Sequence, residues 1–111
     1  MPVNEEYLKY IQDQLSEFGD VEIKRMFGGI GIFKEGLMFS KIGGDTFRLK
    51  VDETNQADFE ALGMKPYFNE KKKKGMPYWE VPLEIIEDRS KLAAWANTSF
   101  EIAKKLAAKK G

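Results

Sequence analysis

The chain has 111 residues, of which 42% are hydrophobic and 32% charged, with eight Phe, four Tyr and two Trp. This length and composition predict one folded domain over residues 1–111, because such a chain buries about two-thirds of the surface that it exposes when unfolded. The formal net charge is zero. The chain has neither His nor Cys, and the lack of these two residues excludes disulfides, Ser-His and Cys-His catalysis and the usual zinc, copper and haem sites.

The first predicted element is a helix over residues 4–18. Asn4 is suited to cap it and Gly19 to end it. Its apolar residues recur at helical spacing: Leu8, Ile11, Leu15 and Phe18. The opening sequence has neither a basic start nor an apolar run, and no stretch approaches the roughly 20 apolar residues of a membrane helix. We therefore expect a cytoplasmic protein with no membrane association.

Four short segments with strand character follow, over residues 21–27, 30–33, 37–42 and 46–51. Short links that contain glycine separate them, which predicts hairpins and an antiparallel meander. In the fourth segment apolar residues alternate with Arg48 and Lys50. One face of this strand is therefore predicted to lie on the core, and the face with Arg48 and Lys50 to meet solvent or a partner.

The glycines of KRMFGGIGIF, residues 24–33, raise the question of a phosphate-binding loop. A dinucleotide fingerprint requires a third glycine and a following helix. Here Lys34 stands at the third position, a strand pattern follows, and no Gly-Lys-Ser or Gly-Lys-Thr occurs in the chain. The pattern therefore indicates a tight turn between two strands and no nucleotide cofactor. The apolar residues around the turn are expected to fill or flank the core: Met26, Phe27, Ile30 and Ile32.

Arg25 is the residue of this stretch that the alternation does not place. Strict alternation from Ile23 turns Arg25 inward. Either a bulge shifts the register before the turn, or Arg25 lies at an interface or sheet edge with its aliphatic stem packed. Arg25 is therefore a candidate contact for a partner.

Three further elements complete the prediction. Residues 52–62 form a short helix with Asp52 and Glu53 at its cap and with Phe59 and Leu62 turned inward. Residues 76–82 form a fifth strand, which its prolines place at a sheet edge where a partner strand could pair. Residues 88–109 form a long packing helix with lysines near its negative end.

The run of Lys71, Lys72, Lys73 and Lys74 is the most basic segment of the chain. Aromatic residues flank it: Tyr67, Phe68, Tyr78 and Trp79. The lysines could hold phosphates while the rings stack on bases. The other interpretation is a solvated loop whose charge discourages pairing between sheet edges. The zero net charge and the lack of arginine in the run favour the solvated loop.

Together these elements predict an α+β fold. The expected architecture is a two-layer sandwich, in which an antiparallel sheet of about five strands carries the N-terminal and C-terminal helices. The carboxylates form no recognisable acid-base pair or metal-binding motif. We therefore expect no catalytic residue, no metal and no cofactor.

Several motifs occur in order along nearly the whole chain: RMFGGIGIF (25–33), RLKVDETN (48–55), GMPYWEVP (75–82) and WA (95–96). In this order and spacing the sequence resembles the TfoX N-terminal domain family, also called the Sxy-type competence regulators. The resemblance implies a two-layer α+β domain from a cytoplasmic bacterial protein linked to the induction of competence genes, without assigned catalytic residues. Longer members of that family carry a second, C-terminal domain that these 111 residues do not include.

The function expected on these grounds is that of a non-enzymatic regulatory or interaction domain, with a protein partner or a second copy of the chain as its contact. The alternative is a nucleic-acid-binding accessory domain that uses the loop of Lys71 to Lys74. The candidate contact residues are Arg25, Arg48, Lys50, Lys71, Lys72, Lys73 and Lys74.

Overall fold

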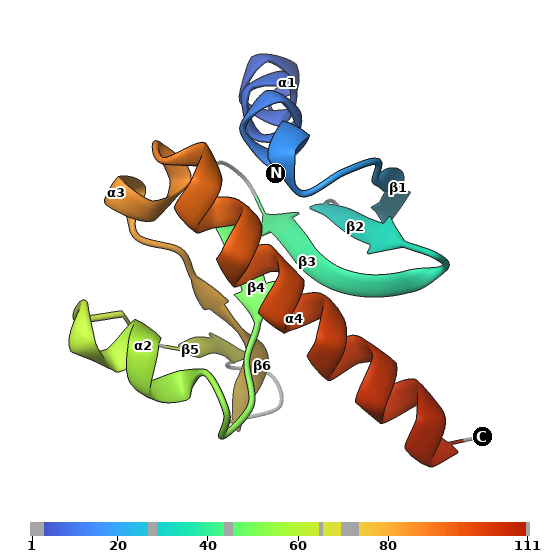
Figure 1. Ribbon diagram of the computed structural model, residues 1–111, viewed down its shortest axis with the longest axis vertical. Helices are drawn as coiled ribbons and strands as arrows, with labels where there is room; N and C mark the ends of the chain where they lie inside the picture. The colour runs from blue at the N-terminus through green and yellow to red at the C-terminus, as the bar shows by residue number, and fades with distance from the viewer. Residues whose placement is uncertain (1–3, 27–28, 44–45, 65, 70–73, 111) are drawn as a thin grey trace.

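The computed structural model describes residues 4–26, 29–43, 46–64, 66–69 and 74–110 (Figure 1). The elements are, in chain order, α1 (Glu5–Gln14), the 3-10 helix η1 (Leu15–Glu17), β1 (Glu22–Met26), β2 (Gly29–Lys34), β3 (Leu37–Gly43), β4 (Thr46–Lys50), α2 (Gln56–Ala61), β5 (Pro66–Asn69), β6 (Lys74–Glu80), α3 (Leu83–Ile86) and α4 (Arg89–Lys110). The predicted α+β class with N-terminal and C-terminal helices on an antiparallel sheet is confirmed.

The sheet has six strands in the order β1-β2-β3-β4-β6-β5, and all its pairs are antiparallel. The meander of β1 to β4 is as predicted, but β5 is a strand that the sequence analysis left out. The prediction that residues 76–82 lie at an edge is wrong, because β6 pairs with β4 on one side and with β5 on the other. Pro77 lies where the register between β5 and β6 shifts, a position that tolerates a residue without an N–H group.

The helix at the start of the chain forms as its capping residues predict. The Oδ1 atom of Asn4 accepts hydrogen bonds from the backbone N–H of Glu6 at 2.8 Å and of Tyr7 at 3.3 Å. The last turn tightens into η1, and Gly19 follows with a φ of +123° that favours glycine. These caps fix where the chain leaves the helix layer and enters β1.

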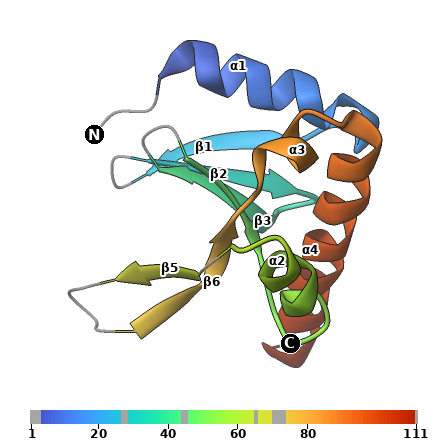
Figure 2. The ribbon, with the colours of Figure 1, turned by 90° about the vertical axis from the view of Figure 1, so that its left-hand side faces the viewer.

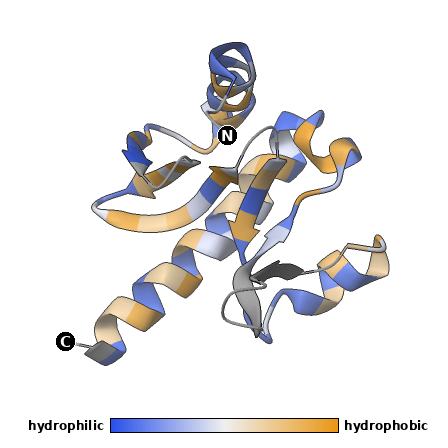
Figure 3. Ribbon diagram, turned by 180° about the vertical axis from the view of Figure 1, so that it is seen from behind, coloured by the Kyte–Doolittle hydropathy of each residue, from blue (hydrophilic) through white to orange (hydrophobic). Residues whose placement is uncertain are grey.

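The helices gather on one side of the strongly curved sheet (Figure 2). Helix α4 packs on β3 and β4, and α1 runs along the end of the sheet formed by β1 and β2. Among the described elements, no helix lies over the other face. That side is nearer the viewer in Figure 3, where β4 alternates between hydrophobic and hydrophilic segments.

The core lies between α4 and the sheet. Phe39 is completely buried, with its ring 5.0 Å from that of Phe18 and 6.5 Å from that of Phe100, centroid to centroid. Ile30 and Ile32 are buried as predicted, whereas Phe27 and the side chain of Met26 lie outside the described residues. A bulge between β2 and β3 explains why Phe39 and its neighbour Ser40 are both buried.

The prediction for residues 52–62 needs two corrections. Helix α2 begins only at Gln56, with Asn55 as its N-cap residue, and Asp52 instead accepts hydrogen bonds from Thr54 in the turn before the helix. Phe59 is buried as predicted, but Leu62 is 39% exposed. The reason is that α2 ends at Ala61, so that Leu62 follows the last helical turn and no longer shares the inward face with Phe59.

Helix α4 confirms the predicted C-terminal helix, and its inward stripe is buried as far as Ala103. Its 22 residues make it about 33 Å long, and its last turns extend past the strands that it covers. Leu106 is therefore 42% exposed, although its spacing is that of the buried stripe. In the part of the chain that the structure describes, no helix is both long and apolar enough to span a bilayer.

Candidate interaction surface

The strand register determines which side chains share the helix-free face. Residues that pair directly across antiparallel strands point to the same side of a sheet. Lys41 of β3 pairs with Arg48 of β4, which pairs with Glu80 of β6. Two residues further along β4, and therefore on the same face, Lys50 pairs with Tyr78. The intervening row, which contains Ser40 and Leu49, is completely buried under the helices.

Tyr78 occupies the centre of this arrangement. The ammonium group of Lys50 lies over its ring, 4.7 Å from the centroid, and that of Lys41 lies 5.8 Å from the same centroid. The Nζ atom of Lys50 also donates a hydrogen bond to the Tyr78 hydroxyl at 3.1 Å. Tyr78 is only 8% exposed, although it belongs to the helix-free face. Lys41, Arg48, Lys50 and Tyr78 are hereafter called the basic cluster.

The basic cluster is partly dehydrated, and the pKa values of its members show this. Burial lowers the pKa of the Lys50 ammonium. Burial also lowers the pKa of Lys41, and the positive charge of Arg48 lowers it further. Burial raises the pKa of the Tyr78 hydroxyl. All three shifts have the same cause, since charge is less stable where water is partly excluded.

The backbone that carries Lys50 is held from the helix layer. Its carbonyl oxygen accepts hydrogen bonds from Ser99 Oγ of α4 at 2.8 Å and from Asn55 Nδ2 at 3.2 Å. Asn55 Oδ1 in turn accepts a hydrogen bond from the N–H of Asp52 at 2.9 Å. Ser99 is completely buried and Asn55 nearly so. The end of β4 is therefore fixed to α4 and to the turn that precedes α2.

A shallow open cleft of about 220 Å³ adjoins Lys50. It lies where β3 begins and β4 ends, under the last turns of α4. Apart from Lys50, its lining is apolar: Leu37, Met38, Ala103, Leu106 and Ala107. The exposed side chain of Leu106 thus borders a surface on which the charge of Lys50 meets apolar groups.

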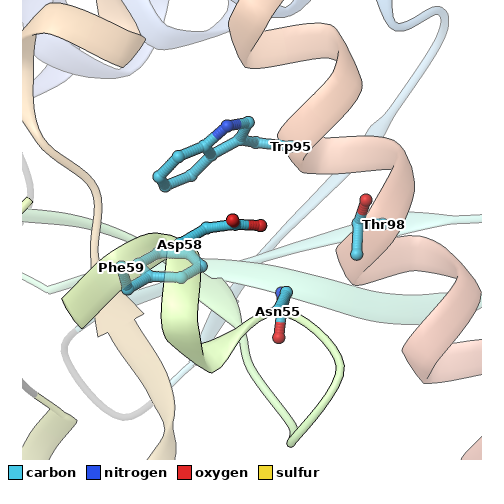
Figure 4. A pocket seen from close by; sticks show the side chains of 5 residues that line it. All are labelled: Asn55, Asp58, Phe59, Trp95 and Thr98. Atoms are coloured by element: carbon cyan, nitrogen blue, oxygen red, sulfur yellow. The ribbon is translucent and has the colours of Figure 1, made fainter. Parts of the chain in front are cut away.

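A second hollow lies between α2 and α4 (Figure 4). Asn55, Asp58, Phe59, Trp95 and Thr98 line it, and its volume of about 20 Å³ holds little more than one water molecule. The rings of Phe59 and Trp95 pack with centroids 4.6 Å apart. This hollow is a gap in the packing between two helices and is too small for a substrate.

The candidate contact residues divide into three groups. Arg48 and Lys50 lie together, and Lys41 joins them, although the sequence analysis missed it. Alternation with Ile42, which is buried, could have placed Lys41 on the outer face of the predicted strand. The bulge at Phe39 interrupts this alternation and so hides the pattern. Lys71, Lys72 and Lys73 lie outside the described residues, as does the side chain of Lys74, which begins β6.

Arg25 is not part of the basic cluster. It lies on the edge strand β1, paired with Ile30, and the strand alternation turns it toward the helix layer. There its guanidinium meets the Glu5 carboxylate of α1 at 2.5 Å, with both side chains 60% exposed. Of the two alternatives for Arg25, the structure therefore favours the sheet edge. The bulge occurs instead between β2 and β3.

Within the described ranges, no three His, Cys, Asp or Glu residues gather in a way that could hold a metal ion. In the described strands, the row of Lys41 and Arg48 also contains the carboxylate of Glu80.

Comparison with known proteins yields one family. The model of the TfoX N-terminal domain matches residues 13–103, from the end of α1 through most of α4. No curated protein matches the chain.

Proposed function

Because the chain belongs to the TfoX N-terminal domain family, whose model covers residues 13–103, we propose that it is a non-enzymatic regulatory domain that acts through protein contacts. We place these contacts in the control of competence genes, which serve DNA uptake, and we place the protein in the cytoplasm. The observation that carries the proposal is the basic cluster, which lies on the sheet face without helices. A face with partly buried cations, over which no helix lies among the described elements, suits a surface that a partner occupies.

The residue composition and the size of the described hollows support the non-enzymatic part of the proposal. The sequence has neither His nor Cys. The hollow between α2 and α4 holds about one water molecule, and the cleft beside Lys50 is open and is lined mostly by apolar residues. Ligand pockets of enzymes are larger, about 300–1,000 Å³, and bring polar groups together around the reacting atoms.

Nucleic-acid binding through Lys71 to Lys74 is the second candidate. Of the aromatic residues that were expected to stack on bases, Tyr78 and Trp79 are each only 8% exposed, so neither offers a free ring face, and the side chains of Tyr67 and Phe68 lie outside the described residues. Protein contact is therefore the first choice. Retention on DNA at low salt tests the second candidate, because phosphate contacts weaken steeply with salt.

Transcript measurement tests the proposed function. The gene is deleted in the cell of origin, and the transcripts of the DNA-uptake genes are quantified before and after complementation. We expect the deletion to change these transcripts and the wild-type gene to restore them. Unchanged transcripts under conditions that induce competence would contradict the proposal. Sedimentation of the purified protein separately tests whether a second copy is the partner, since a dimer dissociates on dilution.

A further inference from the structure

We propose that the helix-free face binds an extended acidic segment of a partner protein, whose carboxylates lie on Lys41, Arg48 and Lys50 and whose neighbouring apolar side chain enters the cleft beside Lys50. This inference rests on the proposed function, since it names the chemistry of the protein partner. Two features carry it: the charges of the basic cluster and the cleft beside Lys50, whose other lining residues are apolar.

The spacing of the cations suits an extended chain. Arg48 and Lys50 are two residues apart on β4, so their Cα atoms are about 6.7 Å apart on the same face. Alternate residues of an extended peptide have the same separation. Lys41 lies beside Arg48 on the adjacent strand. A peptide along β4 therefore places alternate carboxylates over Arg48 and Lys50, with Lys41 beside the first.

The surroundings of the lysines strengthen contacts with carboxylates. Lys41 and Lys50 are half-buried, and Tyr78 beneath them restricts how far their ammonium groups move. A charge-assisted hydrogen bond is stronger where water is partly excluded, and a fixed donor loses less entropy on binding. The backbone of Lys50, held by Ser99 and Asn55, adds to this order.

The cleft supplies the apolar part of the recognition. Its volume of about 220 Å³ is smaller than a pocket for a whole ligand, but suits one branched side chain. Leu106 at its border is 42% exposed and gains burial when an apolar group enters. A partner with acidic residues followed by leucine or a similar residue meets both requirements.

Two other occupants fit less well. A nucleic acid needs many phosphate contacts and exposed rings, but the cluster has three cations and Tyr78 is covered. A second copy could offer the acidic residues of α1, such as Glu6, to the basic cluster. A closed dimer would need this contact to form twice about a twofold axis, whereas an extended peptide needs the basic cluster of one chain only.

The experiment is a titration of the full chain, labelled with nitrogen-15, with the synthetic peptide Gly-Asp-Glu-Asp-Glu-Asp-Leu-Gly, capped at both ends. The matched probes are the same peptide with Asn and Gln in place of its acids, the same peptide with Ser in place of Leu, and a single-stranded DNA of 20 thymidines. Amide chemical shifts report both where each probe binds and how tightly. This design reads the site from the wild-type protein and does not depend on any variant.

We expect shifts in β3, β4 and β6 and at the end of α4, with a Kd in the millimolar range or tighter. The neutral peptide should bind about tenfold more weakly or not at all. The triple variant K41E/R48E/K50E should lose binding to the acidic peptide. The control K9E/R89E/K91E changes the net charge equally at exposed positions away from the basic cluster and the cleft, and should retain it. Circular dichroism checks that both triple variants are folded. If K41E/R48E/K50E unfolds, the neutral variant K41Q/R48Q/K50Q takes its place.

Leu106→Ser tests the cleft. Because Leu106 is 42% exposed, this substitution leaves the core intact. It should weaken binding of the leucine peptide but not of the serine peptide. Three results would overturn the inference: no shifts with the acidic peptide at millimolar concentration, equal losses in both triple variants, or tighter binding of DNA at the same residues. Transcripts separate the two proposals. If K41E/R48E/K50E complements the deletion fully, the inference fails while the proposed function stands, whereas a deletion without effect contradicts the proposed function alone.

Discussion

The carbonyl of Lys50 leads to a quantitative prediction, because it joins three parts of the fold. The ladder between β3 and β4 ends at the pair of Ser40 with Leu49, so the Lys50 carbonyl lies just past it. Ser99 and Asn55 both donate to this oxygen. Removal of either donor leaves the other, and the two substitutions should therefore not be additive.

The magnitudes follow from the hydrogen bonds removed. Ser99→Ala removes one neutral bond and should lower the free energy of unfolding by about 1 kcal/mol. Asn55→Ala removes two, including the one from the Asp52 N–H, and should cost about 2 kcal/mol. The double variant also leaves a buried acceptor without either donor, so it should cost about 4 kcal/mol, a coupling of roughly 1 kcal/mol beyond the sum.

Urea unfolding followed by tryptophan fluorescence measures all four proteins. Each 1 kcal/mol should also lower Tm by roughly 4 °C in a domain of this size. Thr98→Ala is the matched control, since its hydroxyl bonds only within α4 and its loss should change stability by under about 0.5 kcal/mol. Additivity of the two main substitutions within about 0.5 kcal/mol would refute the shared role of the Lys50 carbonyl.

Three further predictions concern the sheet and its edge. Arg25 lowers the pKa of Glu5, first through its hydrogen bond, so Arg25→Gln should raise that pKa toward its ordinary value of 4.5 in an NMR titration; an unchanged value would remove Arg25 as the cause. Because the folded pKa is the lower one, the stability that the pair adds is present above the ordinary value of 4.5 and lost as the pH falls through the folded value, so wild type and Arg25→Gln should converge in urea unfolding at acid pH. Phe39→Ala should cost about 3–5 kcal/mol in the same assay, because it empties the centre of the core, and a loss under about 1 kcal/mol would contradict that position. Glu35 has a φ of +52° beside Gly36 at +80°, a turn that prefers Asn-Gly, so Glu35→Asn should raise Tm, and a lower Tm would count against this description of the turn.

Local patterns in the sequence predicted what depends on neighbouring residues. Asn4 and Gly19 marked the ends of the first helix, and the alternation around Arg48 correctly separated the two faces of β4. These features succeed because caps and strand periodicity act within a few residues. The TfoX resemblance likewise rested on ordered local motifs and agrees with the family match.

Features that depend on contacts between residues far apart in the sequence could not be predicted from local patterns. The place of β6 between β4 and β5 is set by contacts across about 30 residues of chain, and its prolines suggested an edge. Lys41 joined the basic cluster through register, and the bulge at Phe39 hid its periodicity. The partner of Arg25 is a carboxylate from the preceding helix, which strand alternation does not reveal.

The position of β6 also affects the chain during synthesis. Strand β4 emerges from the ribosome well before its second neighbour, because about 30 residues separate Lys50 from Glu80, or roughly 2–6 s of translation. During that interval β4 is an open edge that other nascent chains could join. Arg48 and Lys50 place positive charge along this temporary edge, and charged residues there oppose intermolecular strand pairing. The cations that we assign to a partner are thus also of the kind that opposes pairing between β4 and the strands of other chains while β6 is still missing.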